Sequence, residues 1–108
     1  MRIAVASSDG VHVNLHLGKA SSLYIYEYSE ENGIAFSTHR EVDIDEDSKH
    51  QGSKVLEACK DCDVIICVKY GFKSKIKAED MGIKLVMDEC PINEALEKYI
   101  EHYNFMNK

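Results

Sequence analysis

The residues from Cys62 to Val68 form a near-continuous apolar run with Val64, Ile65 and Ile66 at its centre. A strand that is apolar on both faces is stable only where both faces are covered, so this run belongs in the middle of a parallel sheet between helices. The run therefore favours an α/β fold with one sheet and helices on both of its sides.

Four further segments have the composition of strands. Arg2 to Ser8 is a β-branched and apolar run that ends in a cluster of turn-forming residues. Ser22 to Ser29 is rich in strand-forming residues. The Asn32-Gly33 pair that follows is a strong hairpin signal, so Gly33 to Val42 should return as an antiparallel strand. Ile83 to Met87 is predicted to be a second buried strand.

Three helices are predicted after the hairpin. Ser48 and Gln51 fit a capping box that begins a helix of about three turns, running to Cys59 or Lys60. A short helix is expected over residues 74–81, ended by Gly82. Pro91 suits the first turn of a last helix with one apolar face, made by Ile92, Ala95, Leu96, Tyr99, Ile100 and Tyr103. The order βββαβαβα indicates a three-layer αβα fold with a five-stranded mixed sheet.

The length and charge of the chain limit its function. Its 108 residues fit a single domain, residues 1–108. The net charge of −6 argues against a general nucleic-acid-binding surface and against an anionic membrane as partners. No apolar stretch approaches the roughly 20 residues that span a bilayer, and the first residues lack a signal-peptide layout. A cytoplasmic protein is expected.

Two histidines lie where an open α/β sheet places its ligands, beyond the carboxyl ends of strands. His12 and His16 are in the loop after the first strand, residues 8–20, which should face the loop of residues 69–75 after the fourth strand. A neutral imidazole can ligate a borderline metal, and Gly18 would allow backbone to approach a bulky ligand. The alternative is a surface loop that happens to contain histidine.

The lysines are distributed unevenly. Residues 69–77 contain Lys69, Lys73, Lys75 and Lys77 and no acid, whereas residues 27–47 contain eight acids and only one base, Arg40. The basic segment begins at the predicted site and would suit an anionic ligand such as a phosphate or an anionic metal cluster. The alternative is the solvated start of an amphipathic helix.

The four cysteines are expected to be reduced thiols. Cys59 and Cys62 form a C-x-x-C pair, but it lies where a helix ends and a strand begins, and no second pair completes a zinc site. Cys62 and Cys67 are predicted to be core residues on opposite faces of one strand. Cys90, just before Pro91, is the cysteine most free to act as a metal ligand.

Catalytic motifs are absent. The chain has no P-loop, no G-x-G-x-x-G and no G-x-S-x-G, and no nucleophile with an adjacent base can be named. We therefore expect that the protein is not an enzyme.

Two segments carry a family resemblance. Asn14-Leu15-His16-Leu17-Gly18-Lys19-Ala20, followed by Leu23-Tyr24-Ile25-Tyr26-Glu27, resembles the N-x-H-F-G-x-A…F-x-I-Y-E signature of the dinitrogenase iron-molybdenum cofactor biosynthesis family, whose members are also called nitrogenase accessory factor-like proteins. The likeness extends over roughly residues 1–100. Leu17 replaces the signature phenylalanine, and the turn after the fourth strand keeps one glycine, Gly71.

The resemblance implies a ribonuclease H-like fold and a non-catalytic role. Members would hold or ferry an iron-molybdenum cofactor or its iron-sulfur precursor, with the motif histidine, His16 here, as a cluster ligand. We expect His12 and Cys90 to be auxiliary ligands, and Lys69 and Lys73 to balance the charge of the cluster. Proteins that donate and accept the cluster would be the partners.

Two other functions stay open on the sequence. One is a metal-free structural or regulatory module that binds a protein through the acidic residues 41–47. The other is a small-molecule anion binder at residues 69–77. The oligomeric state is also open, and pairing at the exposed third strand is one route to a dimer.

Overall fold

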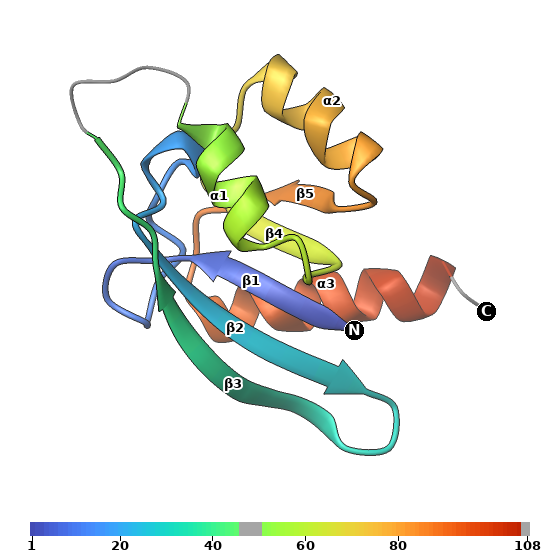
Figure 1. Cartoon of the computed structure of the whole chain (residues 1–108). Coiled ribbons are helices and arrows are strands. Elements are labelled where there is room, and N and C mark those ends of the chain that lie inside the picture. The colour runs from blue at the N-terminus through green and yellow to red at the C-terminus, as the bar shows by residue number, and fades with distance from the viewer. Residues whose placement is uncertain (46–50, 107–108) are drawn as a thin grey trace.

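The computed structural model describes residues 1–45 and 51–106, and within them it confirms the three-layer αβα fold (Figure 1). The elements are, in order, β1 (Arg2–Ala6), the short 3-10 helix η1 (Leu17–Lys19), β2 (Ser22–Ser29), β3 (Gly33–Glu41), α1 (Gly52–Ala58), β4 (Val64–Cys67), α2 (Phe72–Asp80), β5 (Lys84–Met87) and α3 (Ile92–Met106). The five strands form one sheet in the order β3-β2-β1-β4-β5.

The sheet is mixed, as the sequence predicts. β2 and β3 form an antiparallel hairpin whose turn contains Gly33 at φ 70°, and β2 also runs antiparallel to β1. β4 runs parallel to β1 and to β5, and the crossover from β4 to β5 passes through α2. The carboxyl ends of β1, β4 and β5 therefore lie at the same edge of the sheet.

Two hydrophobic cores cover the two faces of the sheet. α1 and α2 lie on one face and α3 on the other (Figure 1). Within β4, Ile65 and Cys67 face the first core, while Val64 and Ile66 face the second. All four are buried, which confirms that β4 is an interior strand apolar on both faces.

The structure corrects the start of two helices. α1 begins at Gly52 with Gln51 as its N-cap and without a side-chain capping bond, so Gln51 does not take the third helical position that a capping box requires. Ser48, the predicted cap, lies outside the described residues, as do Glu46 and Asp47 of the acidic segment. α2 begins at Phe72, two residues earlier than predicted.

The prediction that residues 83–87 form a buried strand is wrong for most of β5. Ile83 is buried, but it precedes the strand; Lys84 and Met87 are exposed, and Leu85 and Val86 are only half-buried. β5 is an edge strand, so it has a neighbour on one side only. Its apolar composition does not reveal this lateral position.

No helix among residues 1–45 and 51–106 is both long enough and apolar enough to cross a membrane.

Candidate functional site

Three loops are joined at the carboxyl edge of the sheet by main-chain hydrogen bonds. The Leu17 N–H donates to the Lys69 carbonyl, and the Val68 N–H donates to the Leu15 carbonyl, each over 2.9 Å. The loop after β1 therefore lies against the loop after β4, as predicted. A third loop, between β5 and α3, joins them through an antiparallel bridge between His12 and Pro91, which was not predicted.

His16 is the N-cap residue of η1 and has an extended backbone. Its imidazole is exposed and makes no hydrogen bond or ion pair with the described residues. The residue after it, Leu17, is buried in the core shared with α1 and fixes the backbone beneath the histidine. The site thus presents a free imidazole on an anchored backbone.

Gly18 and Gly52 bring η1 close to the start of α1. A Cβ atom added at Gly18 would lie 3.9 Å from the Gly52 nitrogen, which is an ordinary contact distance. Gly18 is half-buried here. A Cβ atom therefore fits at Gly18 beside Gly52, and the predicted contact of Gly18 with a ligand stays a prediction.

His12 is oriented by Asp9. One Asp9 carboxylate oxygen, Oδ1, accepts the N–H groups of Val11 at 2.8 Å and His12 at 2.9 Å, and Oδ2 lies 3.3 Å from His12 Nδ1. These backbone bonds, led by that of His12, hold the pKa of Asp9 well below its usual range. A histidine that donates through Nδ1 keeps Nε2 as its free acceptor, which is how many metal-bound histidines are held.

Sequence reasoning missed the roles of Asp9 and Asn14 in this loop. The Asn14 side chain accepts the Ser8 N–H and donates to the Ser8 hydroxyl, both over 2.9 Å, which closes the loop. The available signal was the Ser-Ser-Asp-Gly cluster, because Asp in such a turn commonly bonds the backbone two or three residues on.

Cys90 lies beside the histidine loop through its backbone, while its side chain packs against the α3 core. The Val13 N–H donates to the Cys90 carbonyl, and the Val13 and Cys90 side chains both belong to this core. Burial, together with a hydrogen bond to Asp88, raises the pKa of the Cys90 thiol. No group of three or more potential metal ligands occurs within the described parts of the chain.

The basic segment divides between two places. Lys69 lies beside the His16 loop, because its carbonyl accepts the Leu17 N–H, and Lys73 is in the first turn of α2; both lysines are exposed. Lys77 instead bonds the Ser53 hydroxyl and lies 3.3 Å from a Glu57 carboxylate oxygen, where it ties α2 to α1. The positive charge of Lys77, which was predicted to serve the site, therefore stabilises the contact between α1 and α2 instead.

The remaining cysteines, Cys59, Cys62 and Cys67, are buried and form no disulfide, which confirms Cys62 and Cys67 as core residues. Cys62 and Cys67 both lie in the core beneath α1 and α2, so the prediction that they face opposite sides is wrong. The physical reason is that Cys62 precedes β4, where strand alternation does not apply. Burial raises the pKa of the Cys67 thiol to about 12.

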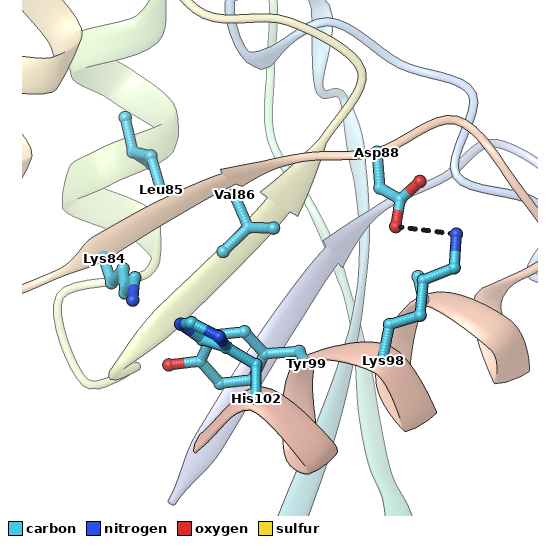
Figure 2. A pocket seen from close by; sticks show the side chains of 8 residues that line it. Lys84, Leu85, Val86, Asp88, Lys98, Tyr99 and His102 are labelled. Atoms are coloured by element: carbon cyan, nitrogen blue, oxygen red, sulfur yellow. Dashed lines mark ion pairs between the residues drawn. The ribbon is translucent and has the colours of Figure 1, made fainter. Parts of the chain in front are cut away.

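A pocket of about 310 Å³ lies between β5 and α3 (Figure 2). It is lined by Lys84, Leu85, Val86, Asp88, Ala95, Lys98, Tyr99 and His102. None of the predicted site residues lines this pocket, so it is separate from the exposed His16 surface.

The comparisons with known proteins agree over nearly the whole chain. The model of the family described as dinitrogenase iron-molybdenum cofactor matches residues 1–102. The FeMo cofactor biosynthesis protein NifB of Azotobacter vinelandii is 33% identical over 105 residues, covering 87% of this chain and 20% of that protein. The NifB protein of Sinorhizobium fredii is 30% identical over 90 residues, covering 78% and 18%. The chain therefore spans about a fifth of the length of these relatives.

Solved structures share the fold. PH0822 matches with a TM-score of 0.74 at 17% identity, covering 94% of this chain and 92% of that one. A proposed NifB protein from Thermotoga matches with a TM-score of 0.66 at 20% identity, covering 93% and 87%. At these identities the likeness establishes the αβα architecture of the chain.

Proposed function

The chain belongs to the dinitrogenase iron-molybdenum cofactor family, and from that premise we propose that it binds and carries a metal cluster during cofactor assembly. The cargo is the iron-molybdenum cofactor or an iron-sulfur precursor of it. The principal protein ligand is His16. The donor and the acceptor of the cluster are other proteins.

The observation that carries the proposal is the free imidazole of His16. The hydrogen bond from the Leu17 N–H to the Lys69 carbonyl holds the adjacent backbone, while the imidazole itself has no partner among the described residues. An exposed ring on a fixed backbone can bind and release a large ligand without rearranging the core. This is what a transfer protein requires, because its cargo must both travel and leave.

The surroundings of His16 support a ligand set of one or two residues. His12 is held by Asp9 with Nε2 free, and so serves as the auxiliary ligand. Lys69, whose carbonyl accepts the Leu17 N–H, and the exposed Lys73 at the start of α2 supply positive charge, which suits a negatively charged cluster. Cys90 is left out of the proposed ligand set, because its side chain packs against the α3 core.

Cluster uptake under anaerobic conditions tests the proposal. The full chain and the variants His16→Ala, His12→Ala and His102→Ala are incubated with cluster donated by a loaded protein or made synthetically. Bound iron and molybdenum are then measured, together with the absorption spectrum. His102 is the matched control, since it is an exposed histidine on α3.

We expect the native chain and His102→Ala to take up cluster to the same extent. His16→Ala should bind at least about tenfold more weakly, because it loses a direct ligand, and His12→Ala should show a smaller loss. If the native chain takes up neither iron nor molybdenum, or if His16→Ala binds like the native chain, the proposal is wrong.

A further inference from the structure

β5 has an open side with hydrogen-bonding groups that point away from the sheet. The N–H groups of Lys84 and Asp88 donate to the carbonyls of Asp63 and Cys67, each over 2.9 Å, on the β4 side. Because the groups of successive residues alternate in direction along a strand, the N–H and carbonyl groups of Leu85 and Met87 face outward. No strand within the described residues pairs with them.

The pocket between β5 and α3 lies directly beside this open edge. Val86, Ala95 and Tyr99 give it an apolar lining, and Figure 2 shows the Val86 side chain between β5 and the Tyr99 ring. A strand added next to β5 would alternate its own side chains, so that every second one faces the α3 side. The pocket is therefore placed to receive side chains of an added strand.

The charges around the pocket determine which side chains an added strand should carry. The Lys84 ammonium lies 5.7 Å from the centre of the Tyr99 ring and has no ion-pair partner among the described residues. Lys98 lies 3.7 Å from an Asp88 carboxylate oxygen, and His102 also lines the pocket. On a chain of net charge −6, this pocket retains an unpaired cation, which attracts acidic side chains and repels basic ones.

We propose that the groove between β5 and α3 binds an extended segment of a partner protein, rich in alternating apolar and acidic residues, which adds to the sheet beside β5. The outward groups of Leu85 and Met87 supply its main-chain hydrogen bonds, as in other cases of strand addition. The pocket takes an apolar side chain, and Lys84 pairs with an acidic one. This surface is separate from His16 and does not depend on cluster binding.

Synthetic peptides of about eight residues provide the test. One alternates valine and glutamate, a second alternates valine and lysine, and a third is the valine-glutamate peptide with a central proline, which cannot donate a strand hydrogen bond. Binding to the full chain is followed by fluorescence anisotropy. Amide hydrogen exchange is measured by NMR at Leu85 and Met87.

We expect the valine-glutamate peptide to bind saturably and at least about tenfold more tightly than the other two. The amides of Leu85 and Met87 should become protected from exchange in the complex. Absence of saturable binding would overturn the proposal, and so would equal binding of the proline peptide. Binding without protection at Leu85 and Met87 would also overturn it, because it would indicate that the pocket takes a small anionic group rather than a strand.

Two pairs of variants test separately the charge of Lys84 and the main-chain hydrogen bonds of β5. Lys84→Glu should weaken the valine-glutamate peptide by about tenfold, while Lys60→Glu, an exposed lysine before β4, should leave binding unchanged. Met87 is 58% exposed, so Met87→Pro removes an outward N–H and keeps the bonds to β4. It should abolish binding, and Met87→Val should retain it. Thermal denaturation confirms that each variant is folded, and equal binding by Met87→Pro and Met87→Val would contradict strand addition.

Discussion

The Asp61 carboxylate joins three separate segments of the chain. One of its oxygens accepts from the Arg2 side chain on β1, and both accept from the Arg40 side chain on β3, each over 2.6 Å. Arg40 also donates to the Ala58 carbonyl at the end of α1. The bonds from Arg40, more than those from Arg2, hold the pKa of Asp61 well below its usual range. Asp61 precedes β4, at the edge of the sheet opposite the histidines, and Arg40 reaches it from a position level with Leu23 and Ala6.

Asp61→Asn should lower the free energy of unfolding at neutral pH by about 1 kcal/mol, a modest value because the side chain is 40% exposed. Because the pKa of Asp61 is lower in the folded than in the unfolded protein, its carboxylate stabilises the fold at every pH above the unfolded-state pKa of about 4. This stabilisation is lost as the pH falls from the unfolded-state pKa toward the folded-state pKa. The difference between native and variant proteins should therefore narrow below about pH 4. Urea denaturation at about pH 7 and pH 3 measures it.

Glu97→Gln, at an exposed position on α3, is the matched control and should change stability little at either pH. A difference between native and Asp61→Asn proteins that is constant with pH would show that the carboxylate charge is not what stabilises the network.

Sequence reasoning placed some site residues correctly and could not place others. The predicted sheet topology placed the His16 loop against Lys69, because it made β1 and β4 parallel neighbours whose carboxyl ends meet. The orientation of Cys90 depends on a single bridge between distant loops, which no local pattern encodes. The burial of the Gln51 Oε1 atom, which has no hydrogen-bond partner among residues 1–45 and 51–106, likewise depends on the exact start of α1.

Among the elements, α1 and α2 meet at Gly52 and Ser74. A Cβ atom added at Gly52 would collide with the Ser74 hydroxyl oxygen but would lie 3.5 Å from the Ser74 Cβ atom, an ordinary contact. Gly52→Ala should therefore destabilise the protein by about 1 kcal/mol or more, despite the better helix propensity of alanine. Ser74→Ala in the same chain should restore most of the loss, because it removes the colliding atom.

A double-mutant cycle measured by urea denaturation tests this contact, and we expect a coupling energy of about 1 kcal/mol. Additive effects of the two substitutions would show that the helices adjust to the extra methyl group in another way.

Strands and helices differ in how well their positions were predicted. Most element boundaries agree within about two residues, the usual precision of hydrophobic period and turn signals. β5 was misjudged because Leu85, Val86 and Met87 are as apolar as a central strand, while burial depends on which strands become neighbours. Local composition determines that a strand forms, and the tertiary topology determines what covers it.

For the whole molecule, the position of each strand in the sheet predicts its resistance to opening. β1 and β4 pair on both sides and are almost fully buried, while β3 is an edge strand with mostly exposed side chains. Amides of Ala4 and Ile65 should therefore exchange only through global unfolding, and outward-facing amides of β3 should exchange at least about a hundredfold faster. Hydrogen exchange followed by NMR measures both sets.

Equal protection of β3 and β1 would contradict this order. If protection of β3 increased with protein concentration, its edge would be paired with a second copy of the chain, and the exchange at low concentration would then give the intrinsic order.

Main-chain hydrogen bonds join the three loops at the carboxyl edge. Every residue type supplies the carbonyl group for such a bond, and every type except proline supplies the N–H group. Replacing the side chain of His12, His16 or Lys69 therefore leaves these main-chain hydrogen bonds in place. Natural selection or protein engineering can exchange the exposed side chains on this frame while the frame itself is inherited unchanged. Proteins with this fold can in this way diverge in the ligand that this edge would bind, with few substitutions and without a new fold.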